Sequence, residues 1–121
     1  MYLDSIAFKA MESGIKQMAI KQEIHSQNIA NIDTPDYHYK TVSFENVLKD
    51  AKDNLGKKEY SFKANVSEIY ETNVLVDGNN VDVDKESLEL YSAYNQSSAI
   101  IQKLNSAIGN LRYVFTNANF K

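Results

Sequence analysis

Apolar residues recur at helical spacing through the N-terminal part of the chain. Lysines and glutamates fall on the opposite side of the same helical wheel, which is the pattern of an amphipathic helix. The apolar side consists of Leu3, Ala7, Ala10, Met11, Gly14, Ile15, Met18, Ala19, His25 and Ile29. A second apolar line consists of Ile6, Ile20 and Ile24. Because Thr34 precedes Pro35 and is pushed away from helical dihedral angles, we predict a helix over residues 3–31.

The strongest pattern is a heptad repeat in the C-terminal part of the chain. Positions step alternately by four and three residues, which is the spacing of a coiled-coil seam. These positions are Leu90, Tyr94, Ser97, Ile101, Leu104, Ile108, Leu111 and Phe115. A flanking line consists of Ala93, Ile100, Ala107 and Val114. Since Asp82 or Asp84 can cap the first turn, the pattern predicts a helix over residues 84–117, about 50 Å long at ~1.5 Å per residue.

The middle of the chain carries weaker and more mixed patterns. Residues 43–53 place apolar side chains on one helical face, so we predict a short helix there. Residues 60–66 alternate apolar and polar positions, which favours a strand, and residues 73–76 are a candidate partner strand. The Asp-Gly-Asn-Asn run that follows is typical of a turn. We therefore expect residues 32–83 to form a loop, a short helix and a possible β-hairpin.

These elements predict a mainly α fold in a single domain that spans residues 1–121. The two long terminal helices most simply pair as an antiparallel coiled-coil hairpin, with a short irregular or β segment between them. Each helix, however, carries more apolar surface than one partner helix can cover. Two interpretations remain open: the middle of the chain folds back over this surface, or the surface binds other molecules.

Composition narrows the function classes. The chain has 121 residues, of which 43% are hydrophobic and 24% charged, so it has the composition of an ordered domain. A net charge of −3 argues against binding of duplex nucleic acid, which normally requires a basic excess. Cysteine is absent, which excludes disulfides and thiolate chemistry. The first residues lack a basic segment followed by an apolar one, so we expect no cleaved signal peptide.

No motif for catalysis or metal binding survives inspection. A metal site would need both histidines, His25 and His38, and their spacing matches no metal-binding motif. His25 lies on the apolar side of the first helix, where a buried, hydrogen-bonded histidine is the usual case. Residues 77–86 resemble the start of a calcium loop, but Asp82 occupies the position where that loop needs glycine. We therefore predict a protein that is not an enzyme and uses no metal or cofactor.

The segment "NIANIDTPDY" resembles a signature found near the end of the first helix in bacterial flagellar rod and hook proteins. The matching residues are Asn28, Ile29, Ala30, Asn31, Thr34, Pro35 and Tyr37, followed by the aromatic Phe44. Asp36 departs from the family, which usually has glycine at this position. Because aspartate is among the few residues that tolerate positive φ, this departure is compatible with the same turn.

A second segment, "DGNNVDVDKE", resembles the element that opens the C-terminal helix in flagellar basal body rod proteins of the proximal rod type. The matching residues are Asp77, Gly78, Asn79, Asn80, Val81, Asp82 and Glu86. Together, the two resemblances identify the chain as similar to this family. They imply a structural subunit without catalysis, whose terminal helices form the inner layer of the rod.

The resemblance also implies partners and a location. Such subunits leave the cytoplasm unfolded through the flagellar export apparatus, without signal cleavage. They assemble helically with copies of themselves, with other rod proteins and with the rod-adaptor protein at the membrane ring. The resemblance implies no nucleic acid and no small-molecule substrate. The expected location is the rod of the flagellar basal body, within the cell envelope, where it transmits torque from motor to hook.

On this interpretation the excess apolar surface forms the contacts between subunits. We expect contacts with neighbouring subunits at Ile6, Ile20, Ile24, Ile100, Ala107 and Val114. We expect the two helices to pair through Leu90, Tyr94, Ile101, Leu104, Ile108, Leu111 and Phe115. Residues 28–44 would form a corner between the helices and the middle of the chain. The alternative is a soluble helical adaptor that presents the same apolar stripes to a partner helix.

Overall fold

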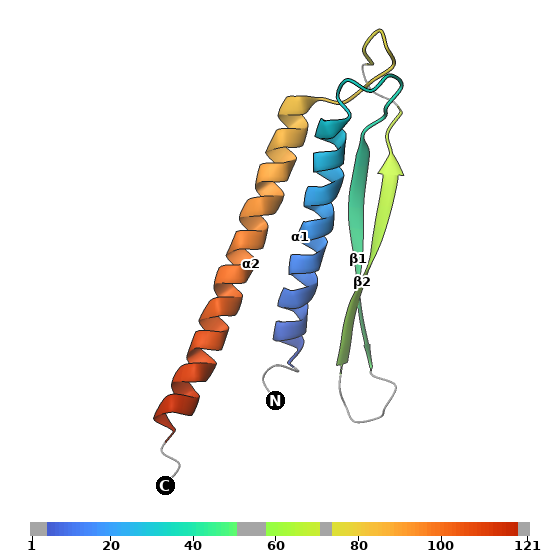
Figure 1. Cartoon of the computed structure of the whole chain (residues 1–121). Coiled ribbons are helices and arrows are strands. Elements are labelled where there is room, and N and C mark those ends of the chain that lie inside the picture. Colours follow the sequence, from blue (N-terminus) through green and yellow to red (C-terminus); the bar gives the residue numbers. More distant parts are fainter. Residues whose placement is uncertain (1–4, 51–57, 71–73, 119–121) are drawn as a thin grey trace.

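The computed structural model describes residues 5–50, 58–70 and 74–118. The elements, in chain order, are α1 (Ile6–Ala30), β1 (Lys40–Asp50), β2 (Lys58–Glu68) and α2 (Val83–Asn117). The predicted fold class is confirmed, because two long helices flank a short antiparallel strand pair. In Figure 1 the molecule is elongated, and α1 lies between α2 on one side and the strand pair on the other. Within the described residues, neither helix is long and apolar enough to cross a membrane.

Both helices begin at a polar cap. The Ser5 hydroxyl accepts a hydrogen bond from the Phe8 amide at 3.2 Å and so satisfies a free donor at the start of α1. The Asp82 carboxylate accepts from the amides of Asp84 and Lys85 at the start of α2. Because the first turn of α2 contains acidic residues, the helix dipole adds to this stabilisation. The capping role predicted for Asp82 is confirmed.

The strands β1 and β2 form one antiparallel ribbon, in register from Lys40 opposite Glu68 to Asp50 opposite Lys58. The predicted short helix over residues 43–53 is therefore wrong where the structure describes that segment, and residues 51–53 lie outside the described part. The reason is that β1 also alternates: Phe44 and its even-numbered neighbours share one face of the ribbon. Pairing with β2 satisfies the backbone of both strands, which a short isolated helix would not achieve.

The predicted strand over residues 60–66 is confirmed as part of β2, but its predicted partner is wrong. Residues 74–76 form no strand and lead into a turn, and residue 73 lies outside the described part. β2 pairs with β1 instead, and the ribbon turns one face toward α1. On that face the Gln17 side chain donates to the Asn46 side-chain oxygen at 2.6 Å. The middle of the chain thus folds back along α1, which settles one of the two interpretations for that helix.

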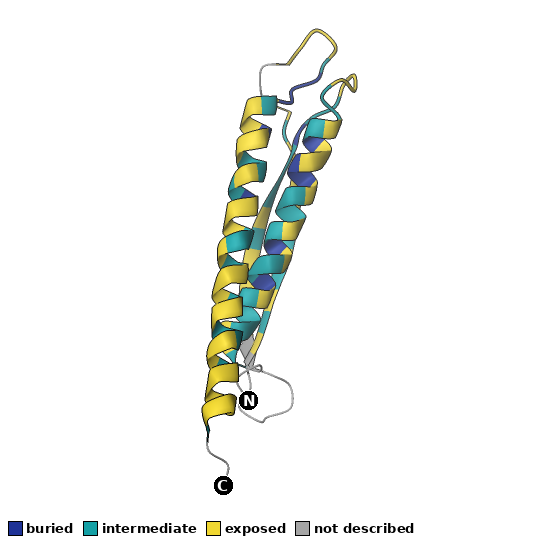
Figure 2. Ribbon diagram, turned by 60° about the vertical axis from the view of Figure 1, so that its left-hand side comes forward, coloured by how far each residue is buried: buried dark blue, intermediate teal, exposed yellow. Residues whose placement is uncertain are grey.

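Folding back also buries part of the apolar line that we expected to be exposed. Ile24 retains 9% of its accessible surface, so the expectation that it contacts neighbouring subunits is wrong. Ile20 is half-buried, whereas Ile6 remains 44% exposed. Figure 2 shows the buried residues of α1 along its length, whereas α2 is largely exposed.

The helices pair along a seam rotated by one residue from the predicted one. Ala93 is completely buried, and the Ile100 Cδ1 atom lies so close to Gly14 that a Cβ there would meet it at 3.1 Å. By contrast, Tyr94 is 60% exposed. The reason is steric, because small residues such as Gly14 and Ala93 allow close approach that a tyrosine would prevent.

The two predicted lines of α2 therefore exchange roles in part. The half-buried positions that fit the predicted seam are Leu90, Ser97, Leu104, Ile108 and Leu111. The positions that the prediction placed in the seam but that are exposed are Tyr94, Ile101 and Phe115. Ile100 and Ala107, which we had assigned to subunit contacts, are half-buried and border the seam. We name Tyr91, Tyr94, Ile101 and Phe115 the α2 stripe, because they leave an apolar band beside the seam.

Candidate functional site

The two sequence motifs lie against one another at the end of the molecule where α1 ends and α2 begins. Residues 31–39, which we call the elbow, connect α1 to β1, and residues 74–82 precede α2 (Figure 1). The Asp36 amide donates to the Asp77 carbonyl at 2.9 Å, and the Asn80 amide donates to the Tyr37 carbonyl at 3.3 Å. Segments about forty residues apart in the sequence therefore form one structural unit.

Asp36 and Gly78 form the closest part of this contact. Asp36 has a φ of 59° and is the one non-glycine residue with positive φ in the described part of the chain. Gly78 has a φ of 85°, and a Cβ at this position would lie 2.2 Å from the Asp36 Oδ1 atom. The glycine is required both by its backbone conformation and by this contact. The positive φ also explains why aspartate can occupy a position where the family usually has glycine.

Asn79 joins the second motif to the end of α1. Its side chain is fully buried, and its Nδ2 donates to the carbonyls of Asn31 and Thr34, both at 2.8 Å. Its Oδ1 accepts from the Val81 amide at 2.8 Å. Carbonyls near a helix C-terminus lack intrahelical donors, so the Asn79 amide acts as a C-terminal cap provided from a distant segment.

Asn80 makes the corresponding link to the strand ribbon. Its Oδ1 accepts from the Tyr39 amide at 2.8 Å, and its Nδ2 donates to the Ile69 carbonyl at 2.6 Å. These groups lie just before β1 and just after β2. The adjacent asparagines thus fix two different elements, Asn79 holding α1 and Asn80 holding the base of the ribbon.

Asn28, the first residue of the first motif, has no exposed surface and lies at the centre of the cluster. Its Nδ2 donates to the Lys40 carbonyl at 2.7 Å and to Glu86 Oε2 at 2.9 Å. Its Oδ1 accepts from the Lys40 amide at 2.9 Å and from the Tyr37 hydroxyl at 3.0 Å. One side chain therefore connects α1, the elbow, β1 and α2.

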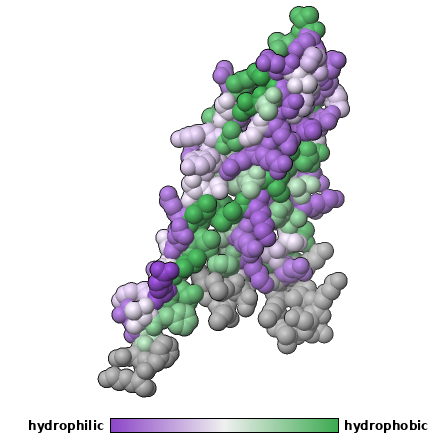
Figure 3. All heavy atoms as spheres, viewed as in Figure 1, coloured by the Kyte–Doolittle hydropathy of each residue, from purple (hydrophilic) through white to green (hydrophobic). Residues whose placement is uncertain are grey.

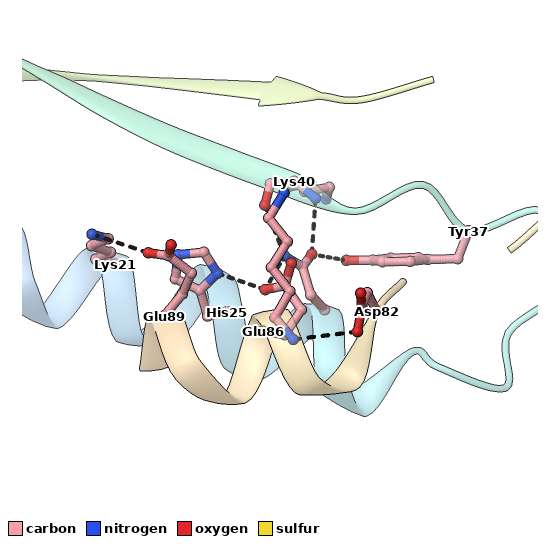
Figure 4. A network of polar contacts seen from close by, with 9 residues as sticks. Lys21, His25, Tyr37, Lys40, Asp82, Glu86 and Glu89 are labelled. Atoms are coloured by element: carbon pink, nitrogen blue, oxygen red, sulfur yellow. Dashed lines mark hydrogen bonds and ion pairs between the residues drawn. The ribbon is translucent and has the colours of Figure 1, made fainter. Parts of the chain in front are cut away.

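Glu86 carries the charge at this centre, and it faces a histidine. His25 Nδ1 lies 2.6 Å from Glu86 Oε2, and both side chains are almost completely buried. Figure 4 shows the two side chains pointing toward each other between α1 and α2, with Tyr37 on the other side of the carboxylate. One turn further along, Lys21 lies 3.4 Å from Glu89. The expectation that His25 is a satisfied, buried histidine is confirmed.

Burial raises the pKa of the Tyr37 hydroxyl above its usual 10, and the carboxylates of Glu86 and Glu68 add to the effect. The hydroxyl therefore remains protonated near neutral pH and can donate its hydrogen bond to Asn28. The raised pKa is a consequence of placing a phenol beside an anionic centre, and it ties the protonation of Tyr37 to the integrity of the cluster.

The cluster is a closed hydrogen-bonded network. Among the described residues, every buried side-chain nitrogen or oxygen has a hydrogen-bond partner. No three or more acidic or histidine side chains of the described part gather in a metal-binding arrangement. What the geometry can do is mechanical: it fixes the ends of two long helices and the base of the ribbon relative to one another. We call this group of residues the polar clamp, and its members are His25, Asn28, Asp36, Tyr37, Gly78, Asn79, Asn80 and Glu86.

The sequence motifs located most of the polar clamp but not all of it. Asn28, Asn31, Thr34, Tyr37 and the residues of the second motif lie together as one group. His25 was missed as a member, although its place one turn before Asn28 on the same helical face was a usable signal. Phe44 lies apart from the clamp, on the ribbon, where its ring packs edge-to-face on Phe62.

Comparison with known proteins connects these motifs to a family. The family model described as "Flagella basal body rod protein" matches residues 9–38, which span most of α1 and nearly all of the elbow. The flagellar basal body rod protein FlgB of Bacillus subtilis (strain 168) is 34% identical over 130 aligned residues, which cover 96% of this chain and 98% of that protein. The similarity therefore extends over both helices, the ribbon and the polar clamp.

Proposed function

The chain belongs to the flagellar basal body rod proteins, and we propose that it is a structural subunit of the rod that assembles through its two long helices. The family consists of structural proteins, and we propose that this chain likewise catalyses no reaction. The soluble adaptor that the residues alone left open is not favoured by these comparisons. The rod function requires surfaces that hold subunits together and a fold that does not bend under torque.

The observation that carries this proposal is the exposed apolar surface of α2. The exposed fractions along the α2 stripe are 63% for Tyr91, 60% for Tyr94, 42% for Ile101 and 59% for Phe115. Tyr94, Ile101 and Phe115 repeat at multiples of seven residues, so they lie on one side of the helix. Monomeric proteins rarely leave such a band in water, because burying each large apolar side chain is worth ~1.5–3 kcal/mol. The band is supported as a contact with helices of other subunits.

The polar clamp supports the second requirement, stiffness. In a subunit that transmits torque, a twist applied to the helices must reach the ribbon without loss at the elbow. The clamp joins these elements through hydrogen bonds with no buried group left unpaired in the described part, which makes any change of angle costly. Corner and clamp together would hold the ribbon at a fixed angle to the inner helices.

We further propose the partners that this assignment implies. They are copies of the same chain, other rod proteins, the rod-adaptor protein at the membrane ring, and the flagellar export apparatus. The location would be the rod within the cell envelope, reached without cleavage of a signal peptide. The absence of cysteine is compatible with passage as an unfolded chain, because no disulfide has to be broken or formed.

The test replaces Ile101 by aspartate in the chromosomal copy. Because Ile101 lies beside the helix seam and is exposed, Ile101→Asp leaves the fold intact while it places a charge in the proposed subunit contact. We expect loss of swimming and absence of the chain from isolated basal bodies, with secretion of the subunit still measurable. The matched control is Gln102→Asp, an exposed neighbour outside the stripe, which should swim normally.

Normal swimming of an Ile101→Asp and Tyr94→Asp double variant would overturn the assignment of this surface. A circular dichroism spectrum like that of the unmodified chain is required of each variant, so that a folding defect is not mistaken for an assembly defect. Substitution of Ile24 would not serve, because that side chain is buried within the subunit and its replacement would destabilise the fold.

A further inference from the structure

The molecule carries a second exposed apolar feature, at the end opposite to the C-terminus. Val74, Leu75 and Val76, which we call the apolar tip, are 52%, 60% and fully exposed. Figure 3 shows hydrophobic surface at the extreme upper end of the molecule, and Figure 1 shows this loop beyond the starts of α2 and β1. Three consecutive exposed aliphatic residues in a surface loop are unusual and call for a partner.

The apolar tip is held in place by the polar clamp. The Leu75 amide donates to the Asn79 carbonyl at 2.8 Å, and the Gly78 amide donates to the Leu75 carbonyl at 2.9 Å. Gly78 in turn contacts Asp36, and Asn79 is fixed to the end of α1. The tip is therefore presented on a fixed base, so little conformational entropy would be lost when it binds.

The opposite end of the molecule offers an apolar groove on α2. Because Gly14 lies opposite Ile100 in an antiparallel pair, the start of α1 lies opposite about residue 108, and α2 continues beyond it. The groove there has a volume of 440 Å³, which lies within the range of about 300–1,000 Å³ typical of binding pockets. We call it the tail groove, and its lining residues are Lys103, Ser106, Ala107, Asn110, Leu111 and Val114.

The two ends are also complementary in charge. The residues around the tip include exposed aspartates at positions 33, 36, 77, 82 and 84, with Lys40 and Lys85 as the neighbouring cations. The last part of α2, residues 101–117, contains Lys103 and Arg112 and no acidic residue. Opposite charge at the two ends favours an arrangement in which unlike ends meet and disfavours one in which like ends meet.

We propose that the apolar tip of one copy binds in the tail groove of a second copy, head to tail. An elongated subunit cannot bring its own two ends together, so the contact must be between molecules. A contact between different surfaces of identical chains does not close on itself and extends into an open helical array. The proposal rests on the function proposed above and adds to it a specific contact along the array, separate from the α2 stripe.

The experiment uses the absence of cysteine from the natural chain. Val76→Cys and Val114→Cys are combined in the chromosomal copy, and basal bodies are isolated and mildly oxidised. Both positions are exposed, so both substitutions leave the fold intact. We expect the band of the chain to shift from the mass of one copy to that of two and more copies. Each single variant should remain at the mass of one copy.

A matched pair, Val76→Cys with Asn105→Cys, places the second thiol on the other side of α2 at similar height and should give no shift. In parallel, a photoreactive benzoylphenylalanine at position 76 identifies the contact by mass spectrometry. Cross-links to residues 103–114 of another copy support the proposal. Cross-links to a different protein or to another segment of the chain overturn it, as does the absence of a shift in the double cysteine variant.

Failure of this proposal differs from failure of the proposed function. If the chain is recovered in basal bodies and the cells swim but no cross-link forms at the tail groove, the head-to-tail contact is wrong and the rod assignment stands. If the unmodified chain is absent from basal bodies, the rod assignment itself is wrong.

Discussion

Replacement of Asn28 by alanine tests the polar clamp at its centre. The substitution removes hydrogen bonds to the Tyr37 hydroxyl, to the Lys40 backbone and to the Glu86 carboxylate, all at a fully buried position. A neutral hydrogen bond contributes ~1 kcal/mol and one to a charged group ~1.5–3 kcal/mol, so we expect a loss of about 4 kcal/mol in the free energy of unfolding. A domain of this size has only ~5–15 kcal/mol in total.

Urea unfolding of the purified chain, followed by circular dichroism at 222 nm as a routine probe of helix, measures this loss. With a slope of about 2 kcal/mol per M for urea, the midpoint should fall by roughly 2 M while the slope stays unchanged. The control is Asn105→Ala, an exposed asparagine of α2, which should change the free energy by less than ~0.5 kcal/mol. Equal midpoints for the Asn28 and Asn105 variants would refute the view that the clamp holds the elements together.

Three further variants probe the clamp. Asp36→Gly should be tolerated and Asp36→Val should lower the melting temperature, because the backbone has positive φ there; equal melting temperatures would contradict this. Glu86→Gln breaks a buried pair with His25 and should cost about 3 kcal/mol in urea unfolding, whereas a neutral outcome would show that the charge is dispensable. The Tyr37 pKa is raised on folding, so its contribution is complete below pH 10 and is lost as pH rises through the folded-state value; Tyr37→Phe should flatten that alkaline decline, and an unchanged decline would exclude Tyr37 as its cause.

Much of the fold follows from local pattern. The helical spacing of apolar residues predicts both terminal helices to within a few residues, and the capping residue of α2 follows from the acidic run before it. The ribbon is harder, because the segment around Phe44 satisfies a helical and a strand pattern equally well. Its pairing with β2 is a contact between distant segments, and no local pattern encodes it.

The helix seam shows a different limit of sequence reasoning. A heptad can be placed on either of two adjacent lines of α2, and residue size favours the line with Tyr94 and Phe115. The structure uses the line with Ala93 and Ile100, because the facing helix carries Gly14 at the point of contact. Which line faces α1 depends on the partner surface, which the repeat itself does not contain.

The polar clamp was predicted in its members more than in its arrangement. The motifs identify Asn28, Asn79 and Asn80 as special, but each side chain acts on a backbone group or carboxylate from a distant segment. His25 escaped notice because a single histidine without a motif carries no chemical signal. Its role becomes visible only when α2 brings Glu86 to within 2.6 Å.

The most direct test of the central claim measures whether the α2 stripe is covered in the assembled rod. Ile101→Cys introduces one thiol at an exposed position of a chain that otherwise has none. Maleimide labelling rates are compared between the purified subunit and isolated basal bodies, with the urea-unfolded chain as the reference for full reactivity. The account predicts rapid labelling of the purified subunit and protection in basal bodies. Equal labelling in both would contradict it.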